Sequence, residues 1–406
     1  MRVSGIGVAV FICAGASLIL PVHAADKVVK IGVLSDQSSL YADSTGPGSS
    51  IAAQMAVEDS GMPARGWKIE VISGDHQNKP DIGATIARKW LDTEGVDAIA
   101  DVPNSGVALA VNTIVREKNA VFLNSGAATS DLTGEQCSPN TVHWTYDTYM
   151  LSHGTGAALA KAGGDTWFFV TADYAFGKAM ERDTSAVVQA AGGRVVGGVK
   201  HPLNTSDFSS FLLQAQSSKA KVIALANAGG DTSNAIKQAK EFGLVEGGQK
   251  LAALLLFITD VHAMGLQVAQ GLNFTTSFYW DRDDGTRSFS QRFQQRVKSG
   301  FKPTLIQAGV YASVAHYLKV LEAADENPHD GKAVVAKMKA MPTNDPLFGN
   351  GSIREDGRKI HPAYLYEVKK PSESKAPWDY YKLVSVIPPE EAWTPLSDSK
   401  CPLVKR

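Results

Sequence analysis

The sequence predicts an α/β protein with two doubly wound lobes, each a parallel sheet covered by helices. Short apolar segments alternate with segments of helical periodicity along most of the chain, an order typical of right-handed βαβ units. The predicted strands are nearly continuous apolar runs, as expected for strands buried on both faces of a sheet. The alternation occurs in two successive series, and each is about as long as an ordinary domain.

The spacing of apolar residues separates the helices from the strands. In residues 81–93, Ile82, Ile86 and Trp90 lie on one helical face, whereas residues 166–171 are a short apolar and aromatic run. In the first series we predict strands at 28–34, 67–73, 96–102 and 120–124, with helices from 49, at 81–93 and at 107–118. In the second we predict helices at 149–162, 178–191, 208–217 and 232–242, with strands at 166–171, 194–199, 221–226, 251–257 and 272–278. Helices at 286–300, 304–323 and 331–341 follow, then strands near 363–368 and 380–386.

The composition is that of an ordinary globular chain. The 406 residues are 44% hydrophobic and 20% charged, and the formal net charge is −1. This balance gives no electrostatic reason to expect binding to nucleic acid or to an anionic membrane surface.

The N-terminus is typical of a secretory signal. Arg2 precedes an apolar core at residues 8–20, and Val22 and Ala24 are small residues at the −3 and −1 positions of a cleavage site. We therefore expect residues 1–24 to be removed after export. An uncleaved anchor and a lipid attached at Cys13 are less favoured alternatives, because the apolar core is short and no small residues precede the cysteine.

Removal of the signal leaves two cysteines, Cys137 and Cys401. Two cysteines in an exported chain allow one intramolecular bridge, so we predict a disulfide between them. Two free buried thiols are the alternative.

The loops that leave the predicted strands carry the candidate binding groups. Residues 125–131, after the strand at 120–124, are rich in Ser, Thr and small side chains. Such a loop, opening toward a helix, can hold an anion with N–H and hydroxyl donors, although an ordinary capped turn has the same residue types. Because ligands of parallel sheets lie beyond the carboxyl ends of the strands, we expect this loop, the Asn104-Ser105 turn and the Tyr41 loop to face one crevice.

Aromatic residues also follow several predicted strands, namely Tyr41, Tyr174, Phe176, Tyr279 and Trp280. Each one alone is more often a packing residue than a ligand contact. Together they predict a crevice with aromatic walls, whose hydrogen-bond donors would come from Ser105, Ala127 and Thr129.

The common catalytic and cofactor motifs are absent from the sequence. No G-x-x-x-x-G-K-[ST], strand-associated G-x-G-x-x-G, G-x-S-x-G or H-E-x-x-H pattern occurs. The nine histidines form no metal-ligand spacing with cysteine. We therefore expect no cofactor, no metal and no enzymatic activity.

Several of these segments resemble the leucine/isoleucine/valine-binding type of periplasmic solute-binding protein, which serves ABC importers. The resemblance covers nearly the whole mature chain and depends on four short motifs and one aromatic position. These are Lys30-Ile31-Gly32-Val33-Leu34, Tyr41, the helix from Gly48 to Asp59, Ala127-Ala128-Thr129, and Asp173-Tyr174-Ala175-Phe176-Gly177.

The resemblance implies a type I periplasmic binding protein with two Rossmann-like lobes joined by a three-strand hinge. Crossings should fall near 144–147, 273–279 and 348–360, which gives lobe one residues 26–145 and 277–351, and lobe two residues 146–276 and 352–406. It also implies that Ser105, Ala127 and Thr129 grip a ligand carboxylate, that Tyr41 and Phe176 contact the ligand, and that a monomer in the periplasm delivers it to ABC permease subunits.

The ligand class stays open at this point. Phe176 stands where amino-acid binders often carry Tyr, and no acidic residue near Gly230 and Asp231, or at Asp260, aligns securely with the one that pairs with an α-ammonium group. We expect an aromatic or hydrophobic organic acid first and a branched-chain amino acid second. A ligand sensor and a hydrolase of small carboxylates are further alternatives.

Overall fold

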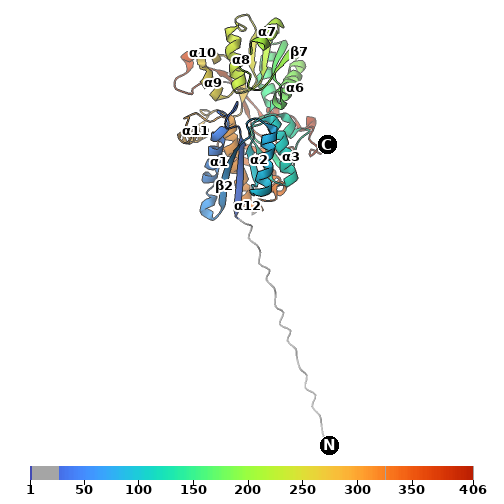
Figure 1. The fold of residues 1–406 in the computed structure, drawn as a ribbon, viewed down its shortest axis with the longest axis vertical. Coiled ribbons are helices and arrows are strands. Elements are labelled where there is room, and N and C mark those ends of the chain that lie inside the picture. Colours follow the sequence, from blue (N-terminus) through green and yellow to red (C-terminus); the bar gives the residue numbers. More distant parts are fainter. Residues whose placement is uncertain (2–26, 325, 406) are drawn as a thin grey trace.

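The computed structural model describes Met1, residues 27–324 and residues 326–405. The predicted secretory signal lies outside the described residues except for Met1, and so does Cys13. The described chain forms two lobes, and Figure 1 shows α1–α3 and α12 in one of them and α6–α10 in the other. No helix of the described part is long and apolar enough to cross a membrane.

The first lobe contains a five-stranded parallel sheet with the order β2-β1-β3-β4-β5. The order reverses between β1 and β3, and ligands of open parallel sheets bind beside such a reversal. Residues of β3 and β4 are buried throughout, as the unbroken apolar runs predict. The bounds are β1 (Val28–Ser35), β2 (Lys68–Asp75), β3 (Ala98–Asp101), β4 (Val121–Asn124) and β5 (Thr141–His143).

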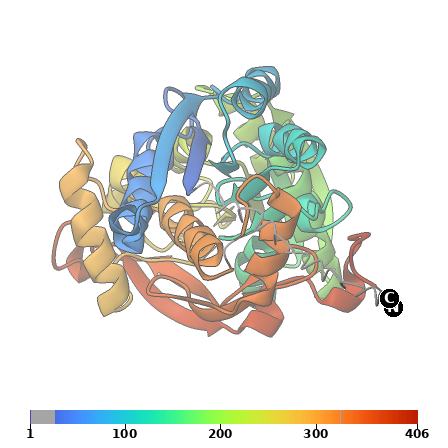
Figure 2. The ribbon, with the colours of Figure 1, turned by 90° about the horizontal axis from the view of Figure 1, so that it is seen from below.

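Helices cover both faces of this sheet. On one face α12 packs along α1, and the two helices lie side by side near the middle of Figure 2. On the other face α2 packs against α3. The helices of this lobe are α1 (Gly46–Ser60), α2 (Pro80–Thr93), α3 (Ser105–Lys118), α11 (Asp284–Arg296), α12 (Leu305–Ala324) and α13 (Gly331–Ala340).

The second lobe contains a four-stranded parallel sheet with the order β7-β6-β8-β9. Its central strands β6 and β8 are the apolar runs predicted from the sequence, and β8 is buried throughout. The strands are β6 (Thr166–Ala172), β7 (Arg194–His201), β8 (Val222–Ala226) and β9 (Lys250–Ala253). The helices are α6 (Ala175–Ala190), α7 (Ser209–Ser217), α8 (Gly230–Glu241), α9 (Ile258–Met264) and α10 (Leu266–Ala269).

The predicted strand at residues 272–278 is shorter and belongs to a different sheet. It is β10 (Asn273–Thr276), which pairs antiparallel with β14 (Ala363–Val368), and β14 pairs with β15 (Tyr381–Ile387). Phe274 is buried against Tyr366 and Tyr381, and this aromatic packing explains why the strand joins the C-terminal segment. The strand β11 (Thr343–Asp345) was not predicted, whereas β12 (Gly349–Ile353) and β13 (Lys359–Ile360) lie within the expected crossing at 348–360.

The predicted helix at residues 149–162 is interrupted. It consists of α4 (Thr148–Leu151), a π-helical turn (Ser152–Gly156) and α5 (Ala157–Lys161). A Cβ at Gly154 would lie 2.1 Å from Oγ1 of Thr275, so only glycine lets this turn approach β10. The Thr155 and Thr275 hydroxyls form a 2.9 Å hydrogen bond there.

Three connections pass between the lobes, at residues 144–147, 277–283 and 361–362. The fully buried Arg358 ties the third connection to the first, because its Nη1 donates to the Tyr146 carbonyl at 3.1 Å and lies 3.4 Å from Asp147 Oδ2. The guanidinium also lies 4.2 Å above the ring of Trp393, in the C-terminal tail. The hinge region is therefore packed around a buried, paired charge.

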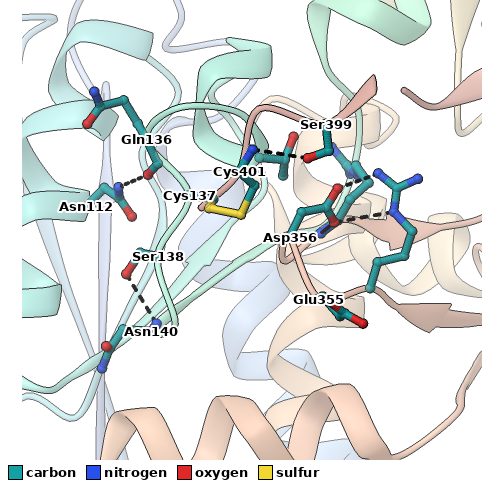
Figure 3. The surroundings of a disulfide bond; sticks show 12 residues. Asn112, Gln136, Cys137, Ser138, Asn140, Glu355, Asp356, Ser399 and Cys401 are labelled. Atoms are coloured by element: carbon teal, nitrogen blue, oxygen red, sulfur yellow. Dashed lines mark hydrogen bonds and ion pairs between the residues drawn. A yellow bond between two sulfur atoms is a disulfide. The ribbon is translucent and has the colours of Figure 1, made fainter. Parts of the chain in front are cut away.

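Cys137 and Cys401 form a disulfide with a Cα–Cα distance of 5.5 Å, which confirms the predicted pairing. Figure 3 shows the bridge beside Asp356 and Ser399, with Cys137 in the loop that follows Gln136. The bridge joins the C-terminal tail to the first lobe, and the Cys401 N–H donates to Ser399 Oγ at 3.2 Å.

We predict that the mature protein shows no free thiol when it is denatured without reductant and titrated. Replacing both cysteines by serine should lower the free energy of unfolding, with an upper figure of about 5 kcal/mol for so long a loop. Urea unfolding of the double variant measures the loss. Two free thiols per mature chain, or an unchanged unfolding midpoint, would contradict the prediction.

Candidate functional site

A small cavity lies between the lobes, at the carboxyl ends of the strands of both parallel sheets. Its volume is about 10 Å³, enough for about one water molecule. A larger guest can enter only if the lobes part. Lobe one contributes Tyr41, Pro103, Ala128 and Ile306, the first interlobe connection contributes Tyr146, and lobe two contributes Tyr174, Phe176, Ala228, Leu255 and Phe257.

Tyr41 reaches the cavity because Asp36 organises its loop. The Asp36 carboxylate accepts hydrogen bonds from the Tyr41 N–H at 2.8 Å and from Nδ2 of Asn78 at 2.6 Å. The Tyr41 hydroxyl lies 2.6 Å from the Tyr174 hydroxyl of the other lobe. Burial raises the pKa of Tyr41 well above its usual value of 10, so this contact joins two neutral phenols.

Two of the predicted donors, Ser105 and Thr129, adjoin each other, but neither is among the residues that line the cavity. The Thr129 N–H donates to Ser105 Oγ at 3.3 Å, and both residues are completely buried. The Thr129 hydroxyl donates to Asp131 Oδ2 at 3.0 Å. A guest anion would have to replace Asp131 as the acceptor of this hydrogen bond.

Two other predicted groups have structural roles. The Ala127 N–H donates to Asn124 Oδ1 at 3.2 Å. Asn104 Oδ1 caps α3 by accepting from the N–H groups of Gly106 and Val107, at 2.9 and 3.1 Å. The loop after β4 also leads into a single 3₁₀ turn at Ser130–Thr133 rather than into the α-helix that we expected, so it has no α-helical N-terminus to offer an anion.

In lobe two, the turn before α8 approaches the Tyr41 loop. A Cβ at Gly229, whose φ is +60°, would lie 2.8 Å from the Leu40 carbonyl oxygen. A Cβ at Gly230 would lie 3.1 Å from Cδ1 of Leu40, its nearest neighbour. Asp231 follows, and its Oδ1 accepts from the Thr205 N–H at 2.9 Å.

Asp231 has one carboxylate oxygen without a partner. Its Oδ2 is buried and makes no hydrogen bond within the described chain, and only 1% of the residue is exposed. Burial raises the pKa of Asp231 to about 7, and its charge is near enough to raise the pKa of Tyr41 and of Tyr174. Asp260 differs, because its Oδ2 caps α9 by accepting from the Phe257 N–H at 2.9 Å.

Tyr279 lies outside this cavity. Its hydroxyl donates to the Trp378 carbonyl at 3.2 Å, and its ring packs 4.7 Å from that of Tyr381. The reason is the strand before it, because β10 leaves the parallel sheet and carries Tyr279 into the C-terminal aromatic cluster.

The sequence did not point to Tyr146 or Asp101. Tyr146 lines the cavity from the first interlobe connection, and its hydroxyl donates to the Gly126 carbonyl at 2.7 Å. Asp101 ends β3 with a φ of +78°, and neither carboxylate oxygen has a hydrogen-bond partner in the described chain. Burial raises its pKa to about 7. The one sequence feature that could have pointed to Asp101 is the Asp-Val-Pro sequence at the end of a strand, because residues before proline rarely continue regular structure.

Comparisons with known proteins agree with the two-lobed α/β fold. A family model described as periplasmic binding protein matches residues 28–375. A crystal structure of a periplasmic binding protein from Burkholderia mallei is 53% identical, with a TM-score of 0.90, and covers 93% of this chain and 100% of that one. A branched chain amino acid ABC transporter periplasmic ligand-binding protein from Burkholderia xenovorans is 41% identical, with a TM-score of 0.82 and the same coverage. A solute binding protein from R. palustris in complex with 4-hydroxybenzoate is 24% identical, with a TM-score of 0.81, and covers 90% of this chain and 98% of that one.

We predict that Gly229→Ala hinders the approach of the lobes, because the added Cβ would meet the Leu40 carbonyl at 2.8 Å and Tyr41 Cδ1 at 3.1 Å. Small-angle X-ray scattering should show a larger radius of gyration than for the wild type. Gly243→Ala is the control, since Gly243 also has a positive φ, +64°, but no neighbour within 4 Å. Equal radii for the two variants would contradict the prediction.

Proposed function

The chain belongs to the periplasmic binding protein family, and we propose that it binds a small carboxylate-bearing solute between its lobes for an ABC uptake transporter. The preferred guest is an aromatic or hydrophobic organic acid. The lobes expected from the sequence are residues 26–145 with 277–351, and 146–276 with 352–406. Because β12 and β13 pair within lobe one and Cys401 bonds to Cys137, we propose that the third crossing lies later, at 361–362, and that the end of the tail packs on lobe one. Family membership implies a periplasmic receptor rather than an enzyme. The proposed receptor is a monomer.

The observation that carries the proposal is the interlobe cavity with aromatic walls, where Tyr174 and Phe176 of lobe two face Tyr41 of lobe one. Ser105 and Thr129 adjoin each other in lobe one outside the lining of this cavity, and their role as carboxylate donors is part of the proposal. The donors are neutral, so they can bind an anion, and the lining is mostly apolar, as is usual for a site that holds a small organic molecule. The R. palustris neighbour, which holds 4-hydroxybenzoate, supports the aromatic acid.

A branched-chain amino acid is the second candidate. The unpartnered Oδ2 of Asp231 favours it, because a buried carboxylate is stabilised by a cationic partner such as an α-ammonium group. The naming of the Burkholderia xenovorans relative as a branched chain amino acid protein supports the same candidate.

Closure explains how such a receptor would signal to its permease. A guest that contacts both lobes binds the closed form better than the open one, so it shifts the population toward the closed form. The permease subunits can then recognise the surface that closure creates. A sensor would use the same movement with a different partner.

We predict that a thermal-shift screen identifies the ligand class. A benzoate- or cinnamate-type acid at one hundred times its dissociation constant should stabilise the protein by about 2.7 kcal/mol. Leucine, isoleucine and valine form the second arm, and neutral benzamide is the control for the charge. If no carboxylate of either arm shifts the melting temperature, the proposed function fails.

We predict that Thr129→Val weakens carboxylate binding by about 1–3 kcal/mol, because the variant keeps the shape of the side chain and loses a donor to a charged acceptor. Calorimetric titration with the best acid of the screen measures the change. Thr113→Val is a matched control, since its hydroxyl donates to the Leu109 carbonyl within α3. An unchanged affinity would remove Thr129 from the site.

We predict opposite pH dependences for the two ligand classes. The pKa of Asp231 is raised to about 7, so the carboxylate ionises as pH rises from 6 to 8. An ammonium group should then bind more tightly, whereas an organic acid should bind more weakly. Asp231→Asn should remove either trend, and a trend that survives in this variant would exclude Asp231 as its cause.

A further inference from the structure

Four side chains beside Thr148, which follows the first interlobe connection, connect the lobes, and we call them the rim latch: Ser130, Asp131, Arg182 and Asp183. Ser130 and Asp131 follow β4 in lobe one, whereas Arg182 and Asp183 lie on α6 in lobe two. Nη1 of Arg182 donates to Asp131 Oδ1 at 2.9 Å, and its Nη2 donates to Ser130 Oγ at 2.7 Å. The Ser130 hydroxyl donates in turn to Asp183 Oδ2 at 2.7 Å.

The network is completed within lobe two. Arg182 Nε donates to Asp183 Oδ1 at 2.8 Å, and the Thr148 hydroxyl donates to Asp183 Oδ2 at 2.6 Å. The Asp183 side chain is 13% exposed, while that of Arg182 is 51% exposed. A single exposed ion pair contributes little. Here the Arg182 guanidinium donates three hydrogen bonds and the Asp183 carboxylate accepts three, one of which joins the two groups, and these charge-assisted bonds fix their geometry.

The rim latch also contacts the loop that we assign to the ligand. Asp131 uses Oδ1 for Arg182 and Oδ2 for the Thr129 hydroxyl, at 2.9 and 3.0 Å. The disulfide at Cys137 holds the other end of this segment, a few residues further along the chain. The segment that begins at Thr129 is thus held by the opposite lobe on one side and by the tail on the other.

We propose that Arg182 and Asp183 are positioning residues that hold the Thr129 loop of the opposite lobe and thereby stabilise the closed form. Their contacts with Ser130 and Asp131 join the two lobes in the structure, and the proposal requires that these contacts separate when the lobes open. The affinity measured for a guest scales with the populated fraction of the binding-competent form, so a loss of these contacts weakens binding without removing any ligand contact. The role in affinity rests on the proposed function, whereas the role in closure does not.

Interlobe distances test the role in closure without any ligand. Nitroxide labels at Ala64→Cys and Ser217→Cys, both exposed and one in each lobe, report the opening of the mature, disulfide-bonded chain by pulsed electron resonance. With Arg182→Ala or Asp183→Asn, the distance distribution should shift toward the open form. Distributions that match the wild type in both variants would overturn the proposal.

Lys178→Ala is the matched control. Lys178 lies one turn earlier on α6 with a 57% exposed side chain, and it pairs at 3.1 Å with Asp173 of its own lobe. The control should leave the distances unchanged, and an equal shift in this variant would show a general effect of charge on α6 and would overturn the proposal. Arg182→Lys keeps the charge without the planar fork, so it should restore the closed form only in part.

Binding kinetics test the role in affinity, with the best acid of the thermal-shift screen as the probe. Arg182→Ala should raise the dissociation rate and the dissociation constant roughly tenfold. If the screen finds no ligand, the proposed function fails. The distance measurement still decides whether the rim latch stabilises the closed form. If Arg182→Ala and Lys178→Ala bind the probe equally well, the role in affinity is excluded.

Discussion

The hydrogen bond between the Tyr41 and Tyr174 hydroxyls is the contact on which the arrangement of the site depends. It joins a loop that leaves β1 of one sheet to a residue that follows β6 of the other. Tyr41 can reach it because Asp36 fixes its loop, and Tyr174 can reach it because the residue immediately precedes α6. The two ends of the parallel sheets are thereby brought face to face, and the cavity between them is lined from both sides.

The fold shows why a receptor can move around this contact. The two parallel sheets share no strand, and the lobes are joined by three connections and by the C-terminal tail, which is bonded to lobe one through Cys401. Arg358 contacts the first connection at Tyr146 and Asp147 and the tail at Trp393, and this buried charge would be costly to leave without its partners. We therefore expect the interior of the hinge to stay intact when the lobes part, and the rim latch and the tyrosine pair to be contacts that separate.

Most of the fold could be predicted because parallel strands carry a strong local signal. The apolar runs at β1, β6 and β8 and the helical periodicity of α2 are visible in the sequence, and β14 occupies the residues expected of it. The sequence did not indicate which sheet β10 joins. Its antiparallel partner β14 lies about ninety residues later, and this pairing does not alter the residue pattern of β10 itself. Tyr279 was misplaced among the cavity aromatics for the same reason.

The candidate site was predicted only in part. The meeting of Ser105 with Thr129 follows from strand order, and the position of Tyr41 opposite Tyr174 and Phe176 follows from the same rule. Strand order does not show which hydrogen bond each polar group makes. Asn104 is used as a helix cap and the Ala127 N–H is used by Asn124, since buried polar groups find the nearest partner. Tyr146 and Asp101 become visible only when the backbone path is known.

A crystal structure with the best ligand of the solute screen would show where the guest lies. We expect its carboxylate within hydrogen-bond distance of Ser105 and Thr129, and its apolar part between Tyr41 and Phe176. A guest held elsewhere, such as the groove of about 570 Å³ beside Val268 and Leu272 in the second lobe, would contradict this expectation.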